Sequence, residues 1–245
     1  LYGDHSNIPL ASYVQNLTYR GIVRFELGFE VTTLEDARQS AAGYDVAATK
    51  RAAQMAALDA SRHEIGYYGF TAPNTRTFGL LNDPNLPDYE TGTDWKTGGF
   101  ATITGDIISM FTRIEAQSGG RVKDNDAMTL VLPLGYRQFM SVSNESGRGQ
   151  TVGEWLQVNY PNVRTIYSPE FVGANGGANI AYLFADSFSG NDDDAYESTI
   201  VQIVPTRHQV RGSQQGIKSY IELATNATAG VVVLFPQAVT RLTGI

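Results

Sequence analysis

The residues of this chain that could do chemistry are few and far apart. It contains no cysteine, which removes disulfides, thiolate zinc sites and cysteine nucleophiles together. The three histidines, His5, His63 and His208, are widely separated and never stand at the spacing of metal ligands. We therefore expect neither a histidine-based metal site nor a catalytic triad.

The densest group of carboxylates is Asp192-Asp193-Asp194 with Glu197. Hard cations prefer oxygen ligands, so a calcium site is one interpretation of this group. It lacks the alternating ligand positions and the fixed glycine of a calcium-binding loop. We interpret it as the solvated tip of a loop.

The segment Gly173 to Ala178 is rich in glycine and precedes a predicted strand. Glycine loops that hold phosphate groups follow a strand and open a helix, with a spacing that is missing here. The Gly-x-Ser-x-Gly motif of serine hydrolases does not occur either. A flexible loop tip is the better interpretation of this segment.

Asp59, His63 and Glu64 fall together on one predicted helix. An acid and a histidine four residues apart on a helix more often form a surface pair than an acid/base couple. We therefore predict no catalytic residue, no cofactor-binding residue, no metal ligand and no cofactor.

The charge balance is acidic, with a formal net charge of -7 and a pI of about 4.9. Proteins that read nucleic acid neutralise phosphates with clustered lysine and arginine. Here the only lysines are Lys50, Lys96, Lys123 and Lys218, and no basic run exists. We expect no specific reader of nucleic acid, although a container that confines its contents without binding them tightly is compatible with this charge. The longest apolar runs, such as 231–235, are far shorter than the ~20 residues that span a bilayer.

The first third of the chain predicts the elements of an elongated unit. Alternating apolar residues between Leu17 and Val31 indicate a strand with one buried face. A short helix begins at Thr33, with a hydroxyl cap and acids in its first turn, and ends at Gly43. An alanine-rich helix, capped by Asp45, follows from Val46 to about Ile65, where Gly66 breaks it. At 1.5 Å per residue it would be ~30 Å long.

The remainder alternates short helices and strands, so the predicted class is α+β. Residues 67–100 are mostly connection, and a helix is predicted from about Asp106 to Gln117. The strand Thr129 to Leu132 precedes a helix over 134–142 with Pro133 as its first residue. Thr151 and Glu154 form a capping box. Further strands are predicted at 164–167, 179–184, 199–204, 219–224 and 230–234.

Several blocks, in this order, resemble the capsid proteins of tailed bacteriophages with the Hong Kong 97-like (Johnson) fold, particularly the encapsulin-related branch. The most specific block is Gly79-Leu80-Leu81-Asn82-Asp83-Pro84-Asn85-Leu86-Pro87. The others are 33–38 leading into the alanine-rich helix that ends in Ile65-Gly66-Tyr67-Tyr68-Gly69, 130–133 with Tyr136, and 230–233 with Pro236, Gly244 and Ile245. The resemblance covers about residue 30 to the end.

This resemblance implies a major capsid protein of flat, extended shape. Its domains would be an N-terminal arm with part of an extended hairpin loop (1–30), a peripheral domain with the long spine helix (31–129), an axial domain (130–215) and strands that return to the periphery (216–245). The loops 173–178 and 187–194 are the candidates for the five- and six-fold axes. Since no lysine precedes Lys50, we expect non-covalent assembly rather than a lysine–asparagine cross-link from residues 1–45.

The resemblance also implies partners and a location. The chain would assemble with copies of itself into pentamers and hexamers of the phage head, in the bacterial host cytoplasm. It would enclose DNA without reading its sequence, with a scaffold, portal or decoration protein as further partners and no membrane. The nearest alternative is an encapsulin nanocompartment shell. Alternatives of other classes are an α+β hydrolase and a glycan-binding module.

Overall fold

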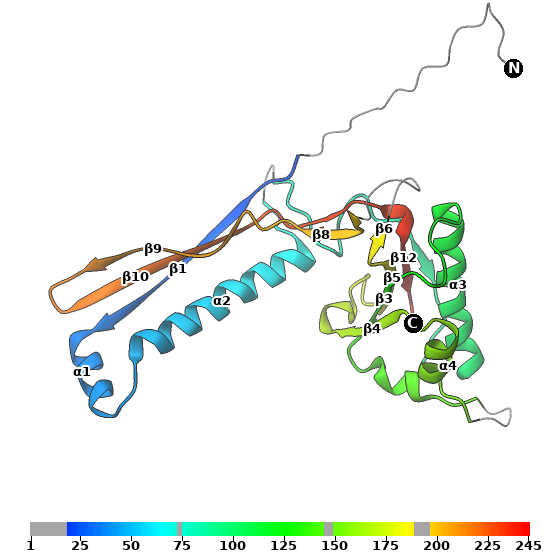
Figure 1. Ribbon diagram of the computed structural model, residues 1–245, viewed down its shortest axis with the longest axis horizontal. Coiled ribbons are helices and arrows are strands. Elements are labelled where there is room, and N and C mark those ends of the chain that lie inside the picture. Colours follow the sequence, from blue (N-terminus) through cyan, green and yellow to red (C-terminus); the bar gives the residue numbers. More distant parts are fainter. Residues whose placement is uncertain (1–18, 73–74, 145–148, 189–196) are drawn as a thin grey trace, which may run out of the picture.

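The computed structural model describes residues 19–72, 75–144, 149–188 and 197–245. These residues form a long arm and a thicker body, joined end to end (Figure 1). The arm consists of strands β1 (Val23–Thr32), β9 (Thr206–Gln215) and β10 (Ser219–Thr228) with helices α1 (Thr33–Ala41) and α2 (Val46–Tyr68). The body is built on a five-stranded sheet. The extended shape agrees with the extended subunit that the resemblance implies, and its flatness stays a prediction.

The arm is a three-stranded antiparallel sheet in the order β1-β10-β9, with α2 lying along it (Figure 1). The register between β1 and β10 runs without interruption from Val23 opposite Thr228 to Thr32 opposite Ser219. The pairing of β10 with β9 shifts register twice. The predicted strand on 17–31 is confirmed as β1, with its start at Val23.

The alanine-rich helix is confirmed as α2, but two details of the prediction are wrong. It ends at Tyr68 rather than at Ile65, because Gly69, with φ 71°, turns the chain. Gly66 lies inside the helix and is buried there: a β-carbon at this position would lie 2.8 Å from the Gln202 amide nitrogen. Gly66 therefore admits a neighbouring side chain and does not break the helix.

The caps of the two arm helices follow the sequence closely. The Asp45 side chain accepts a hydrogen bond from the Ala48 amide at 2.9 Å, as predicted. The cap of α1 is Thr32, whose hydroxyl accepts from the Glu35 amide at 3.2 Å, one residue before the predicted cap. Thr33 instead donates its hydroxyl to the Lys218 carbonyl.

The body sheet has the strand order β2-β12-β5-β3-β4. The strands are β2 (Tyr89–Thr91), β3 (Met128–Pro133), β4 (Val163–Ser168), β5 (Ile180–Ala185) and β12 (Val239–Thr243). Two pairs, β12 with β2 and β3 with β4, are parallel, and the others are antiparallel. Helix α3 (Phe100–Ser118) packs against β12 and β5, and α4 (Val152–Asn159) packs against α3.

An apolar core fills the body between the sheet and its helices. Its fully buried members include Ile103, Ile107, Met110, Leu130 and Leu183. Helix α3 begins at Phe100, a turn and a half before the predicted Asp106. The preceding residue, Gly99, has no side chain that could cap the helix, so the sequence gives no capping signal at the true start. The Thr151–Glu154 capping box is confirmed at the start of α4.

One predicted helix is wrong. Pro133 is the last residue of β3, where it lies opposite Ser168, and not the first residue of a helix. Gly135 then takes a left-handed conformation (φ 92°) and is followed by a short 3-10 helix, Tyr136–Ser141. The other short elements are 3-10 helices Pro169–Phe171 and Pro236–Ala238 and strands β6 (Ser187–Phe188), β7 (Glu197–Ser198), β8 (Ile200–Gln202) and β11 (Val231–Val233).

The contacts group these elements differently from the predicted domain boundaries. Helix α3, placed in the peripheral segment 31–129, packs on β12 in the body. Strand β9, placed in the axial segment 130–215, pairs with β10 in the arm. Strand β12, placed among the returning strands 216–245, lies between β2 and β5 in the body. The assignment of axial and peripheral roles stays a prediction.

Candidate assembly surfaces

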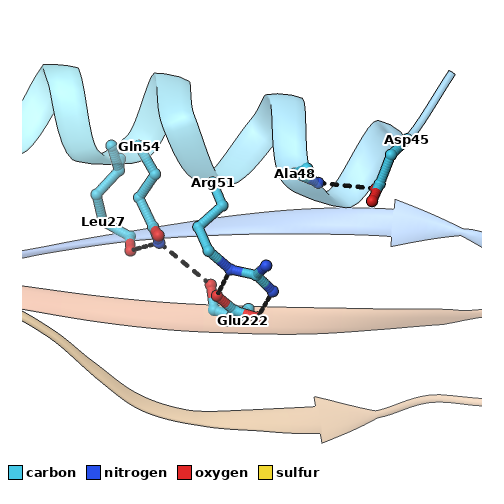
Figure 2. A network of polar contacts seen from close by, with 6 residues as sticks. All are labelled: Leu27, Asp45, Ala48, Arg51, Gln54 and Glu222. Carbon is cyan, nitrogen blue, oxygen red and sulfur yellow. Dashed lines mark hydrogen bonds and ion pairs between the residues drawn. The ribbon is translucent and has the colours of Figure 1, made fainter.

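Polar contacts, more than apolar ones, fasten α2 to the arm sheet. Only Val46, Gln54, Leu58 and Gly66 of its 23 residues are buried. Arg51 donates two hydrogen bonds to the carboxylate of Glu222 on β10, at 2.7 Å from Nε and 2.6 Å from Nη2 (Figure 2). This bidentate geometry is the strongest form of an ion pair and fixes the position of the helix over the strand.

Gln54 makes the second connection, one turn further along α2. Its side-chain amide donates to the Leu27 carbonyl of β1 at 2.6 Å and to the Glu222 carbonyl of β10 at 3.5 Å (Figure 2). Gln54 is 3 % exposed, so these bonds form away from water. One buried amide thus links the helix to two neighbouring strands.

The two charged groups of this contact, Arg51 and Glu222, shift each other's pKa. Hydrogen bonds from Arg51 hold the pKa of Glu222 below its usual value, although burial of the carboxyl acts in the opposite direction. In return, the hydrogen bond to Glu222 raises the pKa of Arg51. Both groups therefore stay charged over the neutral range, and the pair persists there.

A third polar contact ties the start of α2 to β1 and α1. The Lys50 ammonium donates to the Glu30 carbonyl and to the Glu35 carboxylate, both at 2.7 Å. The hydrogen bond from Lys50 lowers the pKa of Glu35. These contacts are partly exposed, so their effect on stability is modest.

The joint between arm and body begins with a set of main-chain contacts. The amides of Leu80 and Leu81 donate to the Gly66 and Tyr67 carbonyls at the end of α2, at 2.8 and 3.0 Å. The Val231 amide, just after β10, donates to the Phe78 carbonyl at 2.8 Å. Three chain segments therefore meet here through their backbones.

Glycines permit this approach. A β-carbon on Gly79 would lie 2.3 Å from the Tyr67 carbonyl oxygen, and one on Gly230 would lie 2.0 Å from the Phe78 carbonyl oxygen. Gly230 also has φ of +80°, which other residues rarely adopt. No side chain fits at either position while the joint keeps this geometry.

The block that resembles phage capsid proteins, Gly79 to Pro87, builds this joint. The Asn82 side chain accepts from the Gly79 amide at 2.7 Å and donates to the Tyr68 carbonyl at 2.8 Å. Asp83, 4 % exposed, forms an ion pair with Arg20 at 2.6 Å and accepts from the Asn85 amide. The side chains that made the block specific are thus the ones that hold the arm on the body.

The residues considered for catalysis do not come together. Asp59 pairs with Arg62 at 3.1 Å, and Glu64 is exposed. His63 contacts Glu170 across the joint, at 3.0 Å between Nε2 and Oε1, and Ser168 donates to the other carboxylate oxygen. Burial would raise the pKa of Glu170, but the hydrogen bonds from Ser168 and His63 outweigh it and lower the pKa. Sequence reasoning missed this contact because Glu170 lies 107 positions from His63.

Ser168 and His63 contact opposite oxygens of Glu170 and have no hydrogen bond to each other, so the cluster lacks the serine–histidine contact of a catalytic triad. His208 lies half-buried on β9, and its Nε2 atom is buried with no hydrogen-bond partner. His5 and the acidic run 192–194 lie outside the described residues, and Glu197 is exposed in β7. Within the described ranges, no three His, Cys, Asp or Glu side chains are grouped so as to hold a metal ion.

The glycine-rich loop 173–178 is tied to the body. The Gly173 amide donates to the Asn179 side chain at 2.9 Å, and the Asn175 side chain donates to Thr243 of β12 at 3.0 Å. Of the second candidate loop, 187–194, only Ser187 and Phe188 in β6 are described. In the part of the chain that the structure describes, no helix is long and apolar enough to cross a membrane.

The arm, the joint and the five-stranded body together define the fold of a shell-forming capsid protein. The capsid of Myoviridae phage XM1 is similar, with a TM-score of 0.69 at 18 % identity, over 92 % of this chain and 74 % of that one. A virus-like particle from Pyrococcus furiosus gives a TM-score of 0.53 at 13 % identity, over 92 % and 77 % of the two chains. The mature capsid of bacteriophage PhiM1 gives 0.50 at 10 % identity, over 98 % and 79 %. At these identities the likeness shows the Hong Kong 97-like fold alone.

The family follows from the sequence as a whole. A family model described as the Pa193 gp26 major capsid protein matches residues 1–244, and the chain belongs to this family. No curated protein sequence matches. The protein is therefore a structural subunit of a phage head, which assembles with its own copies into a shell.

Proposed function

We propose that this chain forms the pentamers and hexamers of an icosahedral phage head, and that its role there is wholly structural. The observation that carries the proposal is the shape and poor burial of the arm. An arm of two helices on three strands, with no buried residue in α1 and four in α2, has too little core of its own and gains order by lying against neighbours. Heterologous contacts of that kind close into rings.

Each unit has its own part in this proposal. The arm (β1, α1, α2, β9 and β10) acts as the peripheral domain, with α2 as its spine. The body acts as the axial domain, and its loops 173–178 and 187–194 face the five- and six-fold axes. In place of boundaries after residues 30, 129 and 215, this proposal has a chain that enters the body at β2, returns to the arm at β9 and β10, and ends in the body with β12, in keeping with the strand pairing.

The contents and partners of the shell are part of the same proposal. The net charge of -7 disfavours tight binding of phosphate backbones, so the head confines its DNA without reading it. A scaffold, portal or decoration protein would bind the assembled shell, and assembly would take place in the cytoplasm of the bacterial host. No metal or cofactor takes part.

Negative-stain electron microscopy of the purified protein, with light scattering on the same sample, tests the proposal. Closed shells, or rings of five and six subunits, are the expected result. A compact monomer at every protein and salt concentration tried would contradict it.

The similarity to the Pyrococcus furiosus particle makes a cellular nanocompartment the second candidate. The two functions differ in what fills the shell. Shells purified from infected or expressing cells would contain nuclease-protected DNA of one length if they are phage heads. Shells that contain a stoichiometric protein cargo and no DNA would favour the nanocompartment.

A further inference from the structure

The free end of the arm exposes three large apolar side chains. Ile217, in the turn between β9 and β10, is 101 % exposed, Tyr44 is 68 % exposed and Leu34 is 59 % exposed. The β9–β10 turn and α1 lie together at the end of the arm that is far from the body (Figure 1). An isoleucine with no contact at all inside its own chain is costly to leave in water.

The turn that carries Ile217 is held in place. The Gly216 amide donates to the Ser219 carbonyl at 2.7 Å, which closes the turn. Thr33, at the start of α1, donates its amide and its hydroxyl to the Lys218 carbonyl, at 2.9 and 3.2 Å. Ile217 is thus presented in a fixed position, and a partner would not have to order it first.

A hollow of about 270 Å³ lies in the same region of the arm, between α1 and the start of α2. Tyr44, Val46 and Thr49 form its less polar side, and Glu35 and Asp45 supply carboxylates. Lys50 also lines the hollow and pairs with Glu35 at 2.7 Å, so Asp45 carries the charge that is left over. Tyr44 is fixed here because its amide donates to the Gln39 carbonyl at 3.0 Å. The hollow therefore offers an apolar surface beside one carboxylate, that of Asp45, which makes no ion pair within the described residues.

The turn and the hollow are complementary in charge. Lys218, next to Ile217, makes no ion pair within the described residues. The sequence from 198 to 221 contains no Asp or Glu, although the chain as a whole is acidic. A basic turn with an apolar tip and a partly acidic hollow on the same end of one chain suit a contact between identical copies.

We propose that Ile217 of one copy inserts into the hollow between α1 and α2 of a second copy, with Lys218 beside the Asp45 carboxylate of that copy. Turn and hollow are different surfaces, so each copy can give one contact and receive another. Such head-to-tail contacts close into a ring around an axis at the arm tips. The inference rests on self-assembly and adds the contact that would join the arms.

The absence of cysteine from the chain makes a direct test available. Shells co-assembled from two single variants, Ile217→Cys and Tyr44→Cys, are oxidised and run on a non-reducing gel. A disulfide requires the two α-carbons to lie within roughly 7 Å, so a covalent dimer reports a contact between copies. In the double variant, the ladder of cross-linked species should end at the number of copies in the ring.

The matched control pairs Tyr44→Cys with Val158→Cys, which replaces a side chain that is 72 % exposed on α4 in the body. The control should stay monomeric. Shells that form normally but give no more dimer from Ile217→Cys with Tyr44→Cys than from the control pair overturn the proposal. Failure of the unmodified chain to form shells would instead count against the proposed function.

A second measurement does not depend on disulfide geometry. Ile217→Asp should reduce the yield of shells about tenfold or more, because burying an isoleucine is worth at least that factor in an association constant. Ile217→Leu should assemble normally. Normal assembly of Ile217→Asp would overturn the proposal. If Ile217→Asp fails to assemble but the cysteine variants give no cross-link, the proposal is also overturned, because Ile217 then binds a different surface.

Discussion

The arm and the body reach a fixed structure by different means. Helix α3 buries seven of its 19 residues, most of them apolar, against the body sheet. Helix α2 is longer, buries four of 23, and is positioned by Arg51, Gln54 and Lys50 through hydrogen bonds. The body is thus stabilised by area removed from water, and the arm by directional contacts. Directional contacts fix the position of an element without requiring the thick core that a flat tile cannot have.

The largest effect is expected at the joint between the two regions. Gly230→Ala puts a methyl group 2.0 Å from the Phe78 carbonyl oxygen and forces a residue with φ of +80° into strain of ~1–3 kcal/mol. We expect a soluble yield and a shell yield near zero. Gly244→Ala is the matched control, since φ is +81° there and no atom lies within 4 Å of the added carbon. Equal behaviour of the two variants in expression and assembly would contradict the steric account of the joint.

The next effect concerns the body core. Ile107 is 0 % exposed, and its neighbour Ile108 is 44 % exposed on the same helix. Ile107→Ala should lower the free energy of unfolding by ~2–5 kcal/mol, because it removes buried methyl groups and leaves a cavity. Ile108→Ala should change it little. Thermal unfolding of both variants measures the difference, and similar melting temperatures would show that the body does not depend on its apolar core.

A smaller, pH-dependent effect is expected in the arm. The pKa of Glu222 is lowered in the folded state, so its contribution to stability is present above the unfolded value of ~4.3 and is lost as the pH falls through the lower folded value. Glu222→Gln should therefore reduce Tm by a few degrees at pH 7 and by progressively less below about pH 4.

Glu26→Gln is the control for the pH series, because Glu26 pairs with Arg24 on the exposed face of β1. It should leave Tm nearly unchanged at every pH. A Tm difference between Glu222→Gln and the unmodified chain that stays constant from pH 7 to pH 3 would refute the role assigned to the ionised pair.

The smallest effects should come from the helix caps, one in each region. Asp45→Ala removes the cap of α2, and Thr151→Ala removes the capping box of α4, at ~0.5–2 kcal/mol each. Limited proteolysis should show faster cleavage near residue 46 in the first variant and near residue 152 in the second. Asp45→Asn keeps an acceptor and should protect the helix start. Uniform protection in all three would mean that the caps are dispensable.

Helix propensity and capping motifs predicted correctly those elements that depend on residues close together in the sequence. Alanine content and the Asp45 cap indicated α2, and the Thr151–Glu154 spacing indicated the start of α4. Strand β9 was missed because its residues, TRHQVRGSQQ, are mostly polar and exposed at the edge of a thin sheet. Gly66 and Pro133 were misread because Gln202 and Ser168, their partners, lie 136 and 35 positions away in sequence.

The assembly surfaces could be predicted only in part. The block Gly79 to Pro87 was identified as specific, but its role became clear only when Asn82 and Asp83 were seen to join the arm to the body. The pair of Arg51 and Glu222 joins residues 171 positions apart, and no pattern in a single sequence indicates it. The absence of an active site stays a prediction.

The exposed face of α2 affects how thick the wall of a shell must be. Its outward positions are largely alanine: Ala52, Ala53, Ala56, Ala57 and Ala60 are all exposed. A helix with ordinary side chains is ~10–12 Å across, and methyl groups make this one thinner. In a shell tiled by such arms, a short coding sequence would enclose more volume, because less of each subunit's mass goes into the thickness of the wall.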